Sequence, residues 1–252
     1  PEFYDTLDID DLTIMGYLSK SNSLQNSLVV GIREAGYDIE YESYYIIELV
    51  YNILEEGTLE LGDRIVSING STDIVEAIGD VACNESVVFD VLRDDVPMTF
   101  RIKRKDISND PDNPDCLFGI RLNRYTEIIS SEITYTLVET NTGGSSGGLL
   151  QALYIYNQIT EFDITRGLKI AGTGTLSVEG KVGPIGGVQQ KILTSHYNNI
   201  DIFFVPHFTS KEGDNYIDAL KVYNTLNTKM VLVPVTTFQD ALDYLLDGDN
   251  FD

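Results

Sequence analysis

Two adjacent serines, Ser145 and Ser146, lie in the glycine-rich stretch 140–150, directly before an apolar pattern that predicts a core-facing helix from Leu149. The glycines permit backbone angles closed to other residues and let a substrate approach the main chain. A helix start offers unpaired N–H groups and a positive dipole end, which favour an alkoxide or the oxyanion of a tetrahedral intermediate. These residues indicate a nucleophile at a helix start. The alternative is a glycine–serine loop that only caps a helix.

A serine becomes a nucleophile only when a neighbouring base removes its proton. His196 and His207 have no acidic partner in a recognisable motif, so lysines and carboxylates remain as candidate bases. Lys191 stands among apolar residues that could desolvate its amine and lower its pKa from about 10.4, namely Ile185, Val188, Ile192 and Leu193. The alternative is a solvated lysine on a helix face.

Taken together, residues 144–148 and 184–191 resemble the proteolytic domain of the Lon family, which uses a serine–lysine dyad. The family's Gly-Pro-Ser-Ala-Gly falls on Gly-Ser-Ser-Gly-Gly, and its Pro-Ile-Gly-Gly-x-x-x-Lys falls on Pro-Ile-Gly-Gly-Val-Gln-Gln-Lys. The resemblance implies that Ser146 is the nucleophile and Lys191 the general base. It also implies that Thr173, in Gly-Thr-Gly-Thr, lies beside the lysine and orients its amine.

The same resemblance implies that backbone N–H groups around Gly144, Ser145 and Gly147 form the oxyanion site. Two positions depart from the family motif, since Ser145 replaces a proline and Gly147 replaces an alanine. Both changes loosen the turn that aims the nucleophile. Ser145 therefore remains an alternative nucleophile.

An upstream segment, residues 59–70, reads Leu-Glu-Leu-Gly-Asp-Arg-Ile-Val-Ser-Ile-Asn-Gly, and a helical pattern and two strand patterns follow it. This arrangement resembles a bacterial PDZ domain over residues 44–106. The resemblance implies capture of an extended peptide by strand addition, in a groove between strand Tyr44–Val50 and helix Asp73–Ala82. The alternative is a domain that only packs against or positions its neighbour.

The predicted fold class is α/β (α+β), with a PDZ-like β-rich domain followed by a Lon-type α/β proteolytic domain. We expect an N-terminal segment with one amphipathic helix (1–43), the PDZ-like domain (44–106), a proline-interrupted linker (107–116) and the proteolytic domain (117–252). Ser71 or Thr72 is the expected cap of the helix at residues 73–82. Predicted strands are Tyr44–Val50, Arg64–Asn69, Ser86–Leu92, Met98–Lys103, Phe118–Leu122, Glu132–Val138, Lys169–Leu176, Ile202–Val205 and Met230–Pro234, and further helices are Tyr216–Leu226, Thr237–Leu246 and one carrying Lys191.

The net charge of −23 makes nucleic acid an improbable partner and repels an anionic bilayer, but it does not repel cationic or unfolded neutral polypeptides. An acidic surface that serves only solubility is equally compatible with this charge. The sequence contains no GxxxxGK[S/T] loop for ATP, and Cys83 and Cys116 do not have metal-ligand spacing, so we expect no cofactor and no metal. The two cysteines could pair in an oxidising compartment.

The resemblance implies an ATP-independent serine endopeptidase that acts on extended or unfolded polypeptides captured by the PDZ domain. The alternatives are a catalytically inactive, peptide-binding PDZ adaptor on a Lon-like scaffold, and a purely structural assembly domain. By analogy with PDZ-bearing Lon-like proteins, we expect the extracytoplasmic face of a bacterial cell membrane, an N-terminal membrane anchor that these residues do not include, and a homo-oligomer in the form of a hexameric ring. No apolar run of about twenty residues is present in the sequence.

Overall fold

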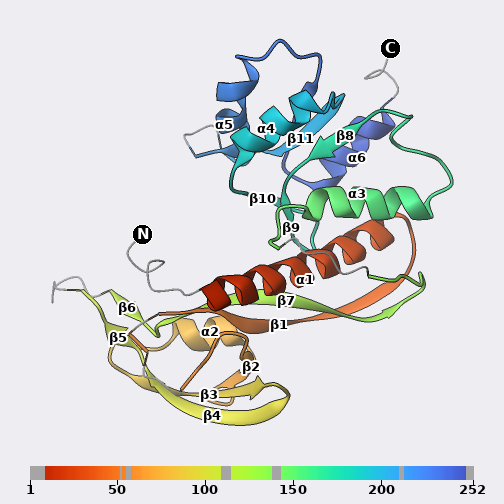
Figure 1. Ribbon diagram of the computed structural model, residues 1–252. Coiled ribbons are helices and arrows are strands. Elements are labelled where there is room, and N and C mark those ends of the chain that lie inside the picture. The colour runs from red at the N-terminus through yellow and green to blue at the C-terminus, as the bar shows by residue number, and fades with distance from the viewer. Residues whose placement is uncertain are drawn as a thin grey trace. The chain divides into compact units, whose positions relative to one another are not determined.

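A computed structural model describes residues 9–51, 53–54, 58–108, 115–137, 143–209 and 213–247 (Figure 1). These residues form two compact units. The first gathers the described residues of Pro1–Leu18 and Glu42–Thr126, and the second those of Ser19–Tyr41 and Glu127–Asp252. Sheets and helices occur in both, which confirms the predicted α/β (α+β) class. Across the described part of the chain, no helix has both the length and the apolar character needed to cross a bilayer.

The first unit is built on a five-stranded sheet with the order β4-β3-β2-β1-β7. Its strands are β1 (Ile39–Val50), β2 (Arg64–Ile68), β3 (Ser86–Arg93), β4 (Val96–Lys103) and β7 (Ile120–Ser131), and helix α2 (Ile74–Gly79) follows β2. The hairpin between β3 and β4 turns on Asp94 and Asp95, whose φ angles of 49° and 62° are those that a two-residue hairpin requires. The predicted order of strands and helix in this region is confirmed. The cap of α2 is Asp73, whose side chain accepts the Glu76 N–H, rather than Ser71 or Thr72.

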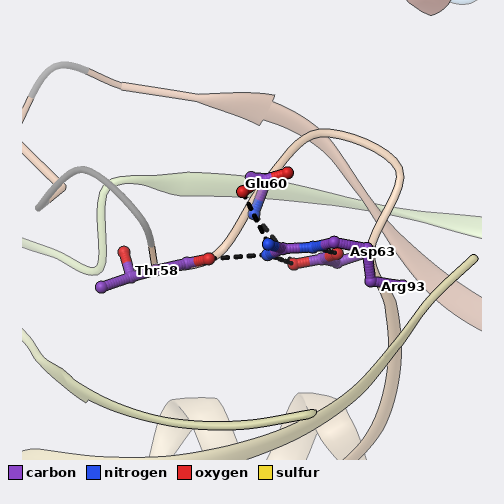
Figure 2. Close-up of polar contacts among 4 residues, drawn as sticks. All are labelled: Thr58, Glu60, Asp63 and Arg93. Carbon is purple, nitrogen blue, oxygen red and sulfur yellow. Dashed lines mark hydrogen bonds and ion pairs between the residues drawn. The ribbon is translucent and has the colours of Figure 1, made fainter. Parts of the chain in front are cut away.

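Asp63, the aspartate of the Gly-Asp pair in the PDZ-like signature, has a structural role in this unit (Figure 2). Asp63 is 1% exposed, and its carboxylate accepts two hydrogen bonds of 2.8 Å from the Arg93 guanidinium. The same guanidinium donates to the Glu60 carboxylate and the Thr58 carbonyl, both at 2.6 Å. Asp63 also accepts the N–H of Glu60 at 2.8 Å. This bidentate ion pair therefore fixes the turn that leads into β2 against the end of β3.

Strand β1 is paired along both of its edges, which contradicts the predicted peptide groove. On one side it pairs with β2, where Tyr45 faces Ile65. On the other side it pairs with β7, and the Tyr51 N–H donates to the Gly119 carbonyl at 2.8 Å where that pairing begins. Strand addition requires unpaired backbone groups at an edge. The groove expected along Tyr44–Val50 is therefore filled by the chain's own β7.

The predicted linker is tied into the first unit at both of its described ends. Short strands β5 (Lys105–Asp106) and β6 (Cys116–Leu117) pair antiparallel, and the Asp106 carboxylate accepts the N–H groups of Ser108 and Asp115. A disulfide joins Cys83 to Cys116, with 5.6 Å between their Cα atoms. Residues 109–114 lie outside the described residues. The first compact unit continues past the linker to Thr126, within β7.

The second unit contains a parallel three-stranded sheet with helices on both faces. Strands β12 (Val231–Val235), β11 (Ile202–Pro206) and β8 (Ile170–Gly172) lie in that order. Alternate residues of β11 point to opposite faces, as the two-residue period of a strand requires. Phe204 packs with helices α3 (Gly148–Ile159) and α6 (Phe238–Leu246), whereas Phe203 packs with α4 (Val188–Tyr197) and α5 (Asn215–Tyr223). A strand buried on both faces explains the continuous apolar run in the sequence.

Three predictions for the second unit change in the structure. Residues 132–137 hold no strand, although their β-branched side chains favour one, and Val138 lies outside the described residues. The single strand predicted at Lys169–Leu176 is divided into β8 and β9 (Thr175–Leu176), because Gly174 has a φ of +157°. Strand β9 then pairs antiparallel with β10 (Val182–Gly183). The helix predicted near the N-terminus is α1 (Ile9–Glu34), and its residues from Ser19 onwards cluster with the second unit.

The buried ion pair gives a stability prediction. We expect Asp63→Ala to lower the free energy of unfolding by about 2–4 kcal/mol, because it leaves the half-buried Arg93 guanidinium without its main partner. Glu42→Ala is the matched control, since Glu42 and Arg64 form an exposed pair at 3.3 Å that contributes under about 1 kcal/mol. Urea unfolding measures both variants. Equal losses in the two variants would contradict a structural role for the Gly-Asp pair.

Candidate active site

The serine turn is shaped by backbone hydrogen bonds and by glycines. Gly144 has a φ of +87°, and Gly147 caps α3 without a side-chain hydrogen bond. Between these two glycines, the backbone carbonyl of Ser145 accepts a hydrogen bond from the Gly148 N–H at 3.2 Å. A Cβ on Gly148 would lie 3.0 Å from Leu176, so a larger residue would push the helix start off β9. Close packing thus places Ser146 immediately before the first turn of α3.

The lysine lies on α4, after a loop that is fixed by a side chain from α5. Asn215 is buried, and its side-chain oxygen accepts the Ile185 N–H at 2.9 Å while its amide nitrogen donates to the Ile185 carbonyl at 2.9 Å. This pair of bonds imitates a strand partner for the Pro-Ile-Gly-Gly loop. Gly187 then caps α4 in the left-handed region, at a φ of +68°. Lys191 follows one turn later. No motif in the sequence predicts the contacts of Asn215 with this loop.

The three side chains named from the motifs lie together. The Nζ atom of Lys191 is 3.1 Å from Oγ of Ser146 and 3.0 Å from Oγ1 of Thr173. Thr173 is 1% exposed, and its hydroxyl donates to the Ser146 carbonyl at 3.0 Å. Its own N–H donates to the Phe204 carbonyl of β11, which anchors it to the central strand of the sheet. Thr173 therefore contacts both the lysine amine and the backbone of the serine turn. Among the described contacts, the Ser145 side chain forms no hydrogen bond with the lysine.

The environment of the lysine favours its uncharged form. Burial lowers the pKa of Lys191 below the ordinary value for a lysine. No carboxylate in the described residues forms an ion pair with this amine, so the effect of burial is not offset by an opposite charge. A neutral amine at 3.1 Å can accept the proton of the Ser146 hydroxyl.

Two N–H groups at the serine turn are available to bind an oxyanion. The Ser146 carbonyl accepts the Gly174 N–H at 2.9 Å, and the Ser145 carbonyl accepts the Gly148 N–H. Within the described ranges, neither the Ser146 N–H nor the Gly147 N–H has an acceptor. Of the predicted oxyanion residues, Gly147 supplies such a group, while Gly144 and Ser145 form the approach to the turn. The N–H of Ser146 itself is a donor that the motif did not single out.

Two serine side chains from α1 contact the serine turn and the start of α3, although no motif in the sequence indicated them. The Ser23 hydroxyl donates to the Ser145 carbonyl at 3.1 Å, and the Ser27 hydroxyl lies 3.0 Å from the Gly148 carbonyl. A Cβ on Gly31 would lie 2.8 Å from the Ala152 carbonyl. Small residues at positions 23, 27 and 31 thus recur every four residues on one face of α1. That spacing was the available signal, because it lets α1 approach α3 closely.

His207 contacts an acidic residue, Asp214, although no sequence motif indicated such a partner. The pair lies at the start of α5 and not at the serine turn. The Nδ1 atom of His207 lies 3.2 Å from the carboxylate of the fully buried Asp214, which caps α5. Burial raises the pKa of Asp214, but hydrogen bonds from the Phe208 and Thr209 N–H groups and from His207 outweigh it and lower the pKa to about 2. No described hydrogen bond joins His207 to Ser146. The histidine therefore belongs to a loop anchor, and the titratable side chain that contacts Ser146 is Lys191.

Comparison with known proteins finds a family model that matches part of this chain. Residues 139–248 match the Lon protease (S16) C-terminal proteolytic domain. The matched range includes the serine turn, Thr173 and the lysine helix.

Among curated proteins, the chain is similar to Lon proteases from several bacteria. The Lon protease of Mesomycoplasma hyopneumoniae is 28% identical over 102 residues, which cover 40% of this chain and 11% of that protein. The Lon protease of Fervidobacterium nodosum is 31% identical over 81 residues, covering 32% of this chain and 9% of that protein. The Lon protease of Campylobacter jejuni is 32% identical over 78 residues, which cover 31% of this chain and 9% of that protein. The chain thus spans about a tenth of the length of these relatives.

The burial of Lys191 can be measured directly. We expect its amine to titrate below about 10.4, the ordinary lysine value, because burial penalises its charged form. NMR of isotope-labelled lysine side chains gives the midpoint, and a Lys191→Met variant assigns the signal. The urea-unfolded protein supplies the reference value. A midpoint in the folded protein equal to or above the unfolded value would contradict desolvation.

Proposed function

We propose that this chain is a serine endopeptidase in which Ser146 is the nucleophile, Lys191 the general base and Thr173 the residue that orients the amine. The observation that carries the proposal is the 3.1 Å approach of the Lys191 Nζ to the Ser146 Oγ, made by an amine whose burial lowers its pKa. The match of residues 139–248 to a Lon proteolytic domain supports the same reaction class.

The proposed reaction proceeds through an acyl-enzyme. Neutral Lys191 takes the Ser146 proton as Oγ attacks the peptide carbonyl, and the N–H groups of Ser146 and Gly147 bind the resulting oxyanion. When the C–N bond breaks, Lys191 returns that proton to the leaving amine. Water then attacks the ester, with the lysine again accepting a proton and giving it back to Oγ. The enzyme regains its starting state without a cofactor.

The proposed substrates are extended or unfolded polypeptides, cleaved without ATP. The sequence contains no GxxxxGK[S/T] loop, and its charge of −23 does not repel cationic or neutral chains. Since β7 occupies the free side of β1, we do not assign peptide capture to that strand. We propose the first unit as an accessory unit with no assigned role in peptide capture.

The Cys83–Cys116 disulfide supports an oxidising compartment. We accordingly propose action at the extracytoplasmic face of a bacterial membrane, with an N-terminal anchor and a hexameric ring as in PDZ-bearing Lon-like proteins. The second candidate function is an inactive peptide-binding adaptor, which the departures at Ser145 and Gly147 favour. A serine-directed phosphonate separates the two, because only an active peptidase is labelled on Ser146.

Replacement of the dyad tests the proposal. We expect Ser146→Ala and Lys191→Arg each to lower kcat/KM for an unfolded polypeptide by at least about a thousandfold, since alanine removes the nucleophile and arginine, which stays protonated, cannot act as a base. Ser145→Ala is the matched control and should retain activity within about tenfold, because no hydrogen bond from its side chain enters the site. Peptide cleavage and circular dichroism are measured together. Activity in a folded Ser146→Ala variant, or its loss in Ser145→Ala, would reject Ser146 as the nucleophile.

The pH dependence tests the base. Only the neutral amine of Lys191 accepts a proton, so kcat/KM should rise with pH, and the lowered pKa places that rise below about pH 10.4. The measurement uses an uncharged peptide substrate and is confined to the pH range in which the protein remains folded. A profile that is flat from about pH 6 to about pH 10 would exclude lysine as the base.

A further inference from the structure

Helix α1 lies outside the segment that matches the proteolytic domain, yet it contacts the serine turn. The match begins at residue 139, whereas the contacting residues of α1 lie between Ser23 and Gly31. This part of α1 belongs to the same compact unit as the turn, and Figure 1 shows it lying along α3. Ser23 and Ser27 are both buried there. An element absent from the matched domain therefore contributes polar groups directly to the turn that bears the nucleophile.

The contact from Ser23 fixes the peptide plane that precedes the nucleophile. A peptide unit is planar and trans, so its C=O and its N–H point in opposite directions. The Ser145 carbonyl accepts both the Gly148 N–H at 3.2 Å and the Ser23 hydroxyl at 3.1 Å. These two bonds occupy the acceptor sites of the carbonyl and hold the plane. The opposite end of that same plane is the Ser146 N–H, which is aimed away from α1 and has no acceptor in the described structure.

The next peptide plane is held in the same way, but from the sheet side. The Ser146 carbonyl accepts the Gly174 N–H at 2.9 Å and the Thr173 hydroxyl at 3.0 Å. The Gly147 N–H is consequently aimed as well, and it also lacks an acceptor among the described residues. Both oxyanion donors are thus oriented through the carbonyls behind them. The sheet supplies one anchor, and α1 supplies the other.

Two further groups contact Ser23: the Ser27 hydroxyl, and the Gln151 amide oxygen, which is a second and more distant acceptor for the single Ser23 hydroxyl proton. The Ser27 hydroxyl lies 2.6 Å from the Ser23 carbonyl and 3.0 Å from the Gly148 carbonyl, so it joins α1 to the first turn of α3. The Gln151 amide oxygen lies 3.4 Å from the Ser23 hydroxyl. A Cβ on Gly148 would lie 3.0 Å from that same hydroxyl, which shows how closely the two helices cross. The hydroxyl of Ser23 therefore has little space in which to change its rotamer.

We propose that Ser23 is a positioning residue for the oxyanion site: through the Ser145 carbonyl it aims the N–H of Ser146 at the developing oxyanion. The inference rests on the proposed peptidase function and adds to it a group outside the matched domain. Because an oxyanion exists only in the tetrahedral state, the contribution of Ser23 belongs to the transition state and not to substrate binding.

The test compares turnover with the binding of a tetrahedral analogue. We expect Ser23→Ala to lower kcat roughly tenfold to a hundredfold while KM changes less than about threefold. Affinity for a peptide boronate, which forms a tetrahedral adduct with the serine, should fall by the same factor as kcat/KM. Ser23→Cys keeps most of the side-chain volume but offers only a weak donor, and it should give an intermediate loss. It serves as the variant of choice if Ser23→Ala does not fold.

Two matched controls separate positioning from stability. Ser21→Ala changes an exposed serine on the same helix. Ser67→Ala removes a buried serine and its 2.7 Å bond to Asp90, which lies in the first unit. Both controls should keep the wild-type kcat and boronate affinity. The proposal is overturned if folded Ser23→Ala matches Ser21→Ala in kcat, or if its loss appears in KM alone.

Failure of the peptidase function has a different signature. Wild-type protein that neither cleaves peptides nor binds the boronate would reject the proposed function. Hydrogen exchange then tests the anchor itself, since amide exchange over residues 144–149 should be about tenfold faster in Ser23→Ala than in Ser21→Ala. Equal exchange rates in the two variants would overturn the anchor regardless of activity.

Discussion

The hydrogen bond between the partly buried amine of Lys191 and the hydroxyl of Ser146 is the interaction around which the second unit is arranged. Lys191 comes from α4 on one face of the parallel sheet, and Ser146 precedes α3, which covers the other face. The two side chains meet at Thr173, directly after β8, where the strand is interrupted before Gly174. The sheet therefore does more than carry a core. It sets the two helices so that the Lys191 Nζ lies 3.1 Å from the Ser146 Oγ, within the reach of the proton transfer that we propose.

Burial of the lysine has a cost in stability. Its folded pKa lies below the unfolded value, so between these two values the unfolded chain binds more protons and low pH favours unfolding. The penalty is full below the folded pKa and is relieved as pH rises towards the unfolded one. Ser146 and Thr173 offer hydroxyl partners to the amine but no opposite charge, so they do not cancel the effect of burial. Reactivity and stability are thus opposed at a single side chain, as is common at functional sites.

Local patterns in the sequence predicted most helices and strands. The sequence did not indicate which strands pair when they lie far apart in the chain. The apolar run at Ile202–Val205 and the Gly-rich motifs predicted β11 and the starts of α3 and α4, because burial and turn geometry act on neighbouring residues. Strand β7 was predicted only as far as Leu122, since its half-exposed continuation mixes Arg124, Thr126 and Glu127 without clear alternation. Its pairing with β1 closed the groove that the PDZ-like signature implied.

The supports of the site were missed for the same reason. Ser23 and Asn215 act through bonds to backbone groups 122 and 30 positions away, and no motif records such partners. A separation of 122 residues also bears on how the protein is made. Ser23 leaves the ribosome long before Ser146 and Lys191, and the strand β12 that completes the sheet comes later still. The arrangement of Ser23, Ser146 and Lys191 can form only after these distant segments have come together, and closing so long a loop is a late event in folding. This site is therefore completed only when synthesis is nearly finished.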